Sequence, residues 1–512
     1  MNNDSGESIS VWMASAEIGA RPPLAENTRA DVCVVGAGIA GLTTAYLLAR
    51  AGRSVVVIDD GPIGGGETSR TTAHVTCALD DRYYDLARLH GEDGARIAAE
   101  SHTAAIAEVE RIVRAEGIDC GFERLDGYLF ASEGTPEDEL RRELEATHAA
   151  GLKDVRLVDR APIPSFNTGP ALCFPNQAQL HPLKYLGGLA AAIERAGGRI
   201  YTGSRADRVS GGKRAGVETV DHSMIDADAV VVATNTPFND LLVIHTKQAA
   251  YRTYVIGLQV ATGSVPRGLF WDTADPYHYI RLQTSDNGPY EILIIGGEDH
   301  KTGQEDDPAA RFGRLEQWAR ERFPMAGEVE FRWSGQVLEP VDGLAFIGHN
   351  PVDDDNVYII TGASGNGITY GTIGGMIITD RIMGREHPWA SLYDPGRITL
   401  RAAGDFLREG ANTMMQYADW LKGSQVDDYA EIKGGSGAVV WDGVTKVAVY
   451  RDEQGKAHGC SAICPHLGCL VDWNDLEKSW DCPCHGSRFD PRGRVINGPA
   501  NTDLEPVELR KK

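Results

Sequence analysis

A cluster of cysteines and histidines near the C-terminus restricts this chain more than any other feature. Five of the nine cysteines fall within 25 residues, and two histidines stand beside them. The loops that hold them read Cys464-Pro-His466-Leu-Gly-Cys469 and, after 12 residues, Cys482-Pro-Cys484-His485. Thiolates and imidazoles grouped in this way predict a metal site rather than a disulfide framework. Structural zinc or free thiols would also fit the spacing, although each loop has an additional cysteine and a glycine that a zinc ribbon does not need.

Length and charge describe a multidomain acidic protein. At 512 residues the chain has room for about three domains. Its formal charge of -23 disfavours nucleic acid and anionic membranes as partners. The first 19 residues lack the pattern of a signal peptide, and the uncharged run 357–379 is too rich in glycine for a transmembrane helix. We therefore expect a cytoplasmic protein with no transmembrane segment.

A glycine motif near the N-terminus predicts dinucleotide binding. An apolar run over 32–35 leads into Gly36, Gly38 and Gly41, and a helical stretch and a second apolar run follow. This order is typical of strand, turn, helix and strand, in which the glycines allow a tight turn, backbone approach to a pyrophosphate and close packing. Asp59 ends the second strand, where its carboxylate can accept hydrogen bonds from a ribose. The alternative is an ordinary glycine-rich turn.

The remaining pattern divides the chain into a large unit and a small one. Apolar runs at 228–234 and 357–361 predict further buried parallel strands, so the dinucleotide unit is discontinuous. Longer alternating runs, such as 251–260, predict an antiparallel second lobe. A helical stretch over 398–422 precedes short strands that predict a β domain of about 85 residues.

The C-terminal loops resemble the Rieske [2Fe-2S] motif. The resemblance implies that Cys464 and Cys482 bind one iron and that His466 and His485 bind the other. It also implies a disulfide between the remaining pair, Cys469 and Cys484. Ligand type and number then favour an iron-sulfur cluster over zinc.

Two neighbouring positions bear on the potential of such a cluster. Ser487 stands where the family places a hydroxyl that donates to a sulfide, whereas Phe489 stands where the members with the highest potential have a tyrosine donor. Because hydrogen bonds to the cluster raise its potential, we expect an intermediate potential, below that of respiratory Rieske proteins.

The large unit resembles FAD-dependent oxidoreductases of the D-amino-acid oxidase and glycine oxidase superfamily over residues 30–385. The matching motifs occur in the family's order at 65–74, 181–184, 231–235, 342–348 and 362–369. The resemblance implies an α/β FAD-binding Rossmann-like domain with an antiparallel-sheet substrate lobe, followed by a small all-β Rieske domain. We expect the oxidoreductase at 28–385, a helical linker at 386–424 and the Rieske domain at 425–512. The residues expected to bind FAD are Gly36, Gly38, Ile39, Gly41, Asp59, Ser69, Arg70, Thr72, Gly367, Ile368 and Thr369.

One departure from the family concerns the substrate. Amino-acid oxidases carry an arginine after a Trp-x-Gly turn, where it binds the substrate carboxylate, but here Val337 takes that position. An amine or N-substituted amine therefore fits better than an α-amino acid. We expect His74, Arg281 and Gln336 to be the catalytic or substrate-binding residues. Structural roles for His74 and Arg281, or a surface role for Arg281, are the alternatives.

The resemblance therefore predicts a flavin-dependent amine dehydrogenase. The substrate would transfer hydride to FAD, and a Rieske cluster would pass electrons singly to a protein or quinone acceptor. In the reverse arrangement, a ferredoxin or reductase feeds the cluster, which reduces FAD. A redox sensor without turnover is a third reading, which a substrate-sized pocket would disfavour.

Overall fold

The computed structural model describes residues 5–509 except 137, 240–243, 286–287, 305–306, 403, 405–407, 410–411, 413–414, 417–425, 427 and 443–444. Its first layer is a six-stranded sheet in the order β18-β19-β12-β2-β3-β8, parallel except for β18. The strands are β2 (Val32–Val35), β3 (Val55–Ile58), β8 (Arg199–Tyr201), β12 (Ala229–Val232), β18 (Phe346–His349) and β19 (Val357–Thr361). The expected discontinuous Rossmann-like unit is confirmed.

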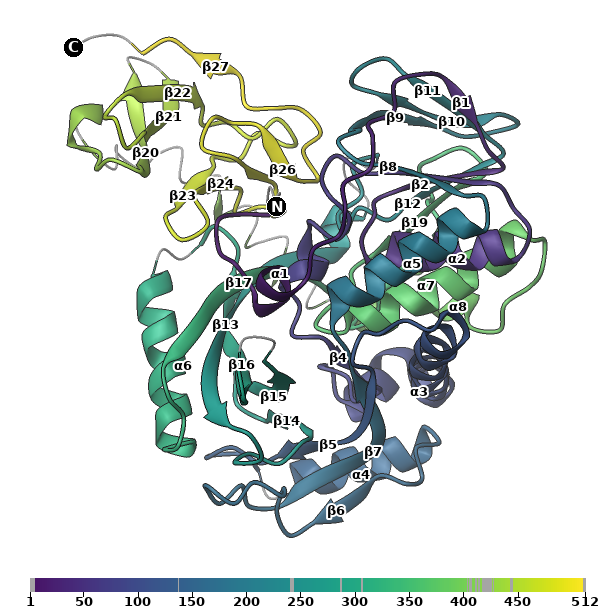
Figure 1. The fold of residues 1–512 in the computed structure, drawn as a ribbon, viewed down its shortest axis with the longest axis vertical. Helices are drawn as coiled ribbons and strands as arrows, with labels where there is room; N and C mark the ends of the chain where they lie inside the picture. The colour runs from purple at the N-terminus through teal and green to yellow at the C-terminus, as the bar shows by residue number, and fades with distance from the viewer. Residues whose placement is uncertain are drawn as a thin grey trace.

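Opposite faces of this sheet are covered differently (Figure 1). On one face lie the helices α2 (Ile39–Arg50), α3 (Tyr83–Glu116), α5 (Pro182–Arg195) and α7 (Gly367–Ile382). On the other lies a small sheet of β1 (Thr28–Arg29), β11 (Met224–Ala227), β10 (Ala215–Thr219) and β9 (Ala206–Ser210). Along β2, Val32 and Val34 pack in the core with the helices, whereas Cys33 and Val35 pack with the small sheet. The uninterrupted apolar strand follows from this burial on both faces.

The glycine turn brings α2 close to the sheet. Gly36 has a φ of +108°, and a Cβ there would lie 2.5 Å from the Ala233 carbonyl oxygen. A Cβ at Gly41 would lie 1.8 Å from the Gly36 carbonyl oxygen. No side chain fits at Gly41, so the close packing of this helix on the preceding turn requires glycine there, as expected.

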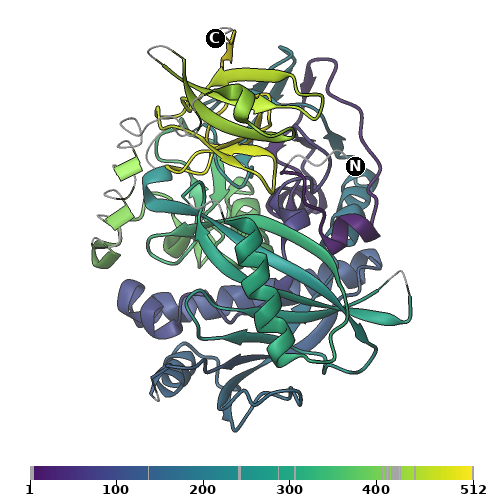
Figure 2. The ribbon, with the colours of Figure 1, turned by 90° about the vertical axis from the view of Figure 1, so that its left-hand side faces the viewer.

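The second lobe is a nine-stranded sheet in the order β17-β13-β16-β15-β14-β5-β7-β4, with β6 paired to β7. It is antiparallel except between β14 and β5. Its strands are β4 (His74–Val75), β5 (Glu123–Phe130), β6 (Arg156–Val158), β7 (Ala171–Gln179), β13 (Gln248–Ala261), β14 (Leu269–Asp272), β15 (Tyr279–Thr284), β16 (Tyr290–Lys301) and β17 (Val329–Pro340). Helix α6 (Pro308–Arg322) packs on one face of the lobe, and α4 (Glu139–Ala149) lies near its far edge (Figures 1 and 2).

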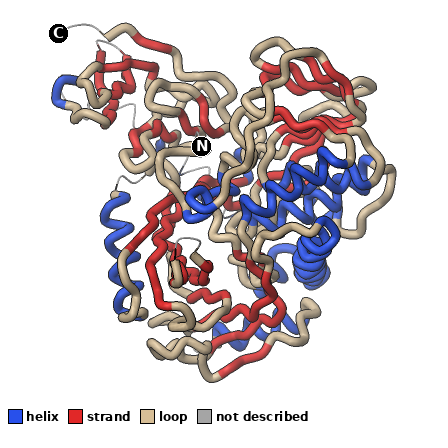
Figure 3. Tube along the Cα trace, viewed as in Figure 1, coloured by secondary structure: helices blue, strands red, loops and turns tan. Residues whose placement is uncertain are grey.

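The C-terminal domain consists mostly of strand and loop (Figure 3). One sheet has the order β20 (Ser436–Asp442), β21 (Thr445–Arg451), β22 (Ala457–Ser461) and β27 (Pro506–Val507). The other has the order β23 (Asp472–Asn474), β24 (Ser479–Asp481), β25 (Arg488–Phe489) and β26 (Val495–Asn497). The expected small all-β domain is confirmed.

Two segments join the domains. Helix α8 (Ala390–Tyr393) follows the oxidoreductase unit, while much of the helix expected over 398–422 lies outside the described residues. At the other end of the chain, the segment before α1 (Val11–Ser15) runs from the C-terminal domain to the large unit (Figure 1). No helix within the described ranges combines the length and apolarity needed to cross a bilayer.

The packing at Gly41 can be tested by Gly41→Ala. The added methyl group meets rigid backbone, so we expect the free energy of unfolding to fall by about 3 kcal/mol, measured by urea denaturation. Gly187→Ala, on α5, is the matched control because its Cβ would lie 3.8 Å from the nearest atom, Ile18 Cγ1. Equal effects of the two substitutions would contradict this explanation.

Candidate functional site

Two loops of the C-terminal domain repeat the same turn and place the cysteines and histidines together. Gly468 N donates to Cys464 O at 3.0 Å, and Gly486 N donates to Cys482 O at 3.0 Å. Both glycines have a positive φ, near +79° and +77°, and this left-handed conformation favours glycine. This geometry gives the two extra glycines of the motif a structural reason.

The thiols and imidazoles form one compact group. Cys464 and Cys482 are buried and hydrogen-bonded to each other, and that bond together with backbone N–H groups and Ser487 lowers the pKa of Cys464. The His466 and His485 ring centroids lie 4.9 Å apart. Nδ1 of His485 is buried and has no hydrogen-bond partner in the described part of the chain, which suits a metal ligand. The donor set therefore fits the two-thiolate, two-imidazole ligation of a Rieske cluster.

A disulfide joins the two loops. Cys469 and Cys484 are bonded, with their Cα atoms 6.4 Å apart, as the resemblance implied. The Sγ of Cys482 lies within 4.8 Å of both disulfide sulfurs. The crosslink thus stands directly beside Cys482, one of the expected ligands of the cluster.

The histidine side of this centre faces the large unit. The ring of His245, at the start of η2 (His245–Lys247), lies 5.1 Å from that of His466 and 6.4 Å from that of His485. Gln336 Nε2, on β17, donates to the Gly486 carbonyl at 3.0 Å. His466 and His485 are consequently buried, at 9% and 8% exposure.

A continuous cavity runs between the Rossmann-like sheet and the lobe. The expected FAD residues that line it are Gly36, Gly38, Ile39, Asp59, Arg70, Thr72, Gly367 and Ile368. Those that do not are Gly41, Ser69 and Thr369. The N-termini of α2 and α7 both open onto the cavity, where free N–H groups and the helix dipoles favour an anionic group. The cavity therefore fits an extended dinucleotide such as FAD.

His74 lines the cavity, but its ring is held by the protein. Nδ1 lies 3.1 Å from Thr72 Oγ1, and Nε2 lies 3.4 Å from the Ile280 carbonyl oxygen. Burial and the positive charge of Arg281 lower the pKa of His74 to about 3, so the ring is neutral at physiological pH. This arrangement is suited to shaping the wall rather than to carrying protons.

Two of the expected substrate contacts, Arg281 and Gln336, stay predictions, although the structure shows other partners for both. Arg281 is not among the residues that line the cavity, and its Nη1 donates to the carbonyl oxygens of Thr72, Ala73 and Leu180 at 2.9–3.2 Å. Gln336 lines the cavity, yet its amide is bonded to Gly486 and Thr302. The Arg281 and Gln336 donors that we assigned to a substrate are thus bonded to backbone carbonyl oxygens, in the case of Gln336 to one in the C-terminal domain.

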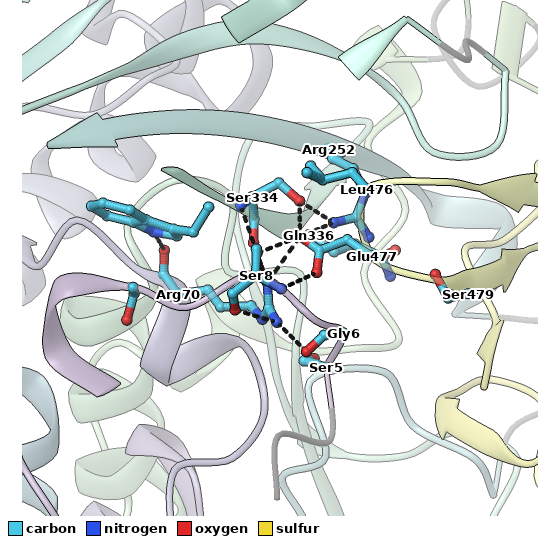
Figure 4. Close-up of polar contacts among 12 residues, drawn as sticks. Ser5, Gly6, Ser8, Arg70, Arg252, Ser334, Gln336, Leu476, Glu477 and Ser479 are labelled. Carbon is cyan, nitrogen blue, oxygen red and sulfur yellow. Dashed lines mark hydrogen bonds and ion pairs between the residues drawn. The ribbon is translucent and has the colours of Figure 1, made fainter. Parts of the chain in front are cut away.

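Buried ionic groups hold the C-terminal domain against the large unit (Figure 4). Glu477, in the turn between β23 and β24, accepts from Ser8 Oγ at 2.6 Å and from Arg70 Nη1 at 3.1 Å. The Glu477 and Arg70 side chains are fully buried. Arg252, on β13, and Arg488, on β25, also lie close enough to lower the pKa of Glu477. We call Glu477, Arg70, Arg252 and Arg488, together with Asp481, the interdomain ion network.

The N-terminal segment completes this network. Arg70 Nη2 donates to the Gly6 carbonyl at 3.0 Å, and Arg488 Nη1 donates to the Ser5 carbonyl at 2.8 Å. A Cβ at Gly6 would lie 2.2 Å from a Glu477 carboxylate oxygen. Arg70, expected at the cofactor, therefore uses its guanidinium to tie together the N-terminal segment and both domains.

A Rossmann-like sheet, an antiparallel lobe and a Cys₂His₂ centre define a flavin-dependent oxidoreductase with an appended iron-sulfur domain. Comparison with known families agrees: residues 31–381 match the FAD dependent oxidoreductase (DAO) family, and residues 420–508 match the Rieske [2Fe-2S] domain. The chain belongs to the FAD dependent oxidoreductase family and carries a C-terminal Rieske domain. FAD and a [2Fe-2S] cluster are its cofactors. The boundaries expected at 385 and 424 stay predictions.

Individual relatives extend this picture. The chain is 32% identical over 503 residues to the Rieske 2Fe-2S iron-sulfur protein YhfW of Bacillus subtilis, covering 97% of each. It is 27% identical to the gamma-glutamylputrescine oxidoreductase of Escherichia coli, covering 74% of this chain and 91% of that one. Glycine oxidase from Geobacillus kaustophilus has a similar fold, with a TM-score of 0.60 and 18% identity over 72% of this chain and 99% of that one.

Glu477→Gln tests the interdomain ion network. The amide keeps the shape but leaves buried arginines without their counter-ion, so we expect the free energy of unfolding to fall by about 3–5 kcal/mol in urea denaturation. Glu505→Gln removes an exposed carboxylate of the same domain and should change the free energy of unfolding by less than about 0.5 kcal/mol. If Glu477→Gln lowers the free energy of unfolding no more than the control does, the network is not a major contributor to stability.

The interdomain ion network also predicts that its contribution to the free energy of unfolding is lost in acid. Burial alone would raise the pKa of Glu477, but the charges of Arg70, Arg252 and Arg488 outweigh it and lower the pKa to about 2 from 4.5. Because the folded-state pKa is the lower one, the stabilisation is complete above about pH 4.5 and is lost as the pH falls toward 2. The difference in unfolding free energy between wild type and Glu477→Gln should shrink over that range. A difference independent of pH would contradict the assigned pKa.

Proposed function

We propose that this protein oxidises an amine or N-substituted amine and relays the electrons through its Rieske cluster to an external one-electron acceptor. FAD supplies the two-electron step and the cluster supplies one-electron transfer. The substrate loses hydride from the carbon next to nitrogen and becomes an iminium ion, which water hydrolyses to a carbonyl compound and the released amine. The two electrons leave one at a time to a protein or quinone.

The contact between Gln336 and Gly486 carries this proposal. Gln336 lines the cavity, and its amide reaches the loop that holds His485. The Gly486 turn fits against the large unit so closely that a Cβ there would lie 2.4 Å from Ala250 Cβ. A short covalent and hydrogen-bonded path therefore links the cavity wall to a ligand histidine, which favours electron transfer within the chain.

The substrate end of the cavity supports an amine. Val337 lines it where a carboxylate-binding arginine would stand in amino-acid oxidases, and Arg281 offers no donor to it. The neutral ring of His74, held by Thr72 and Ile280, contributes a fixed wall. The chain's share of catalysis is then to position the amine and exclude water. A lined cavity of this kind also favours an enzyme over a sensor without turnover.

Anaerobic titration with secondary and tertiary amines, followed by visible and EPR spectroscopy, tests the proposal. We expect an amine to bleach the flavin and a Rieske-type EPR signal to follow. Bleaching without any cluster signal would exclude the relay. If no amine reduces the flavin, while reduced ferredoxin reduces first the cluster and then the flavin, electrons flow in the reverse direction.

Gln336→Met tests the path itself. Loss of the amide hydrogen bond to Gly486 should slow cluster reduction at least about tenfold, the equivalent of about 1.4 kcal/mol in the barrier, in anaerobic stopped-flow experiments. Gln259→Met is the control, because Gln259 bonds Glu330 and does not line the cavity. If cluster reduction is equally fast in both variants, Gln336 has no part in the path.

A further inference from the structure

Three carboxylates from separate segments line the lobe side of the cavity. They are Asp80, Asp299 on β16 and Glu339 on β17. Asp80 accepts from Gly365 N at 3.0 Å, and Glu339 accepts from Ser364 Oγ at 2.6 Å. Neutral groups thus supply these hydrogen bonds. Within the described ranges, no lysine or arginine nitrogen lies within 4.0 Å of any of the three carboxylates.

The group is short of positive charge. Burial and repulsion from neighbouring acids raise the pKa of Glu339 well above its usual value, and burial raises that of Asp299 to about 7. Oδ1 of Asp299 is buried, and none of the described residues forms a hydrogen bond with it. A buried acceptor without a partner costs free energy, so it indicates a donor that the protein alone does not supply. A cation in the cavity would both complete the hydrogen bonding and relieve the repulsion.

The walls beside the carboxylates are aromatic. Trp271, Tyr277 and Tyr279 line the same cavity, and the two tyrosine ring centroids lie 5.5 Å apart. Aromatic faces attract ammonium groups and cover methylene carbons. Together with the three acids they form a surface suited to an alkylammonium ion, rather than to a bare metal ion.

We propose that the substrate carries a second amino group, as a diamine or polyamine does, and that Asp80, Asp299 and Glu339 bind this charged group while the other amino group is oxidised. The inference rests on the proposed amine oxidation and narrows its substrate class. The formal charge of -23 favours the approach of such a cation from solution.

Kinetics with the holoenzyme test the inference directly. Putrescine and spermidine should have a kcat/KM at least tenfold above that of n-butylamine, which lacks the second amino group. Asp299→Asn and Glu339→Gln should each lower that ratio at least fivefold while retaining the flavin and cluster spectra. Asp126→Asn, on β5 and outside the cavity, should leave the ratio within twofold. Equal activity on the monoamine, or a ratio that neither cavity variant changes, would overturn the inference.

Binding separates this inference from the proposed reaction. Equilibrium dialysis of putrescine against dithionite-reduced holoenzyme measures recognition without oxidation, and both cavity variants should weaken it at least tenfold. If putrescine binds in this way but no amine reduces the flavin, the proposed reaction fails and the cation site stands. If monoamines are oxidised and putrescine shows no such binding, the reaction stands and the cation site fails. Putrescine binding displaced by Mg²⁺ or Ca²⁺ would point to a metal site and overturn the inference.

Discussion

The burial of Glu477 against Arg70 is the interaction on which the arrangement of this protein depends. A charged pair with no solvent access is stable only when other polar groups complete it. Here the partners come from the Rieske turn, the N-terminal segment and the large unit. No one of these three parts satisfies the charges alone, so the network fixes their relative positions.

Fixed docking determines which side of the cysteine and histidine group meets the large unit. His466 and His485 lie next to His245, and the loop that carries His485 is bonded to Gln336. The same residue lines the cavity expected to hold FAD. The proposed relay from a two-electron centre to a one-electron centre therefore does not require the Rieske domain to travel between partners.

Features carried by neighbouring residues were predictable from the sequence, whereas features assembled from distant segments were not. The glycine turn and the two metal-binding loops each lie within a few residues, and their backbone geometry follows from local rules. The interdomain ion network and the three cavity carboxylates combine segments far apart in the chain. Arg281 shows the same limit, since three backbone carbonyls from other elements take the donors that we assigned to a substrate. Val337 in the place of an arginine indicated only that a carboxylate-binding group was missing, and it did not predict the three acids in the cavity.

The concentration dependence of cluster reduction tests the central claim most directly. After anaerobic mixing with a reducing amine, the Rieske EPR signal should rise in a first-order phase whose rate constant does not change with protein concentration. That result would mean that electrons pass from flavin to cluster within one chain. A rate that rises in proportion to protein concentration would mean transfer between molecules and would contradict the docked relay.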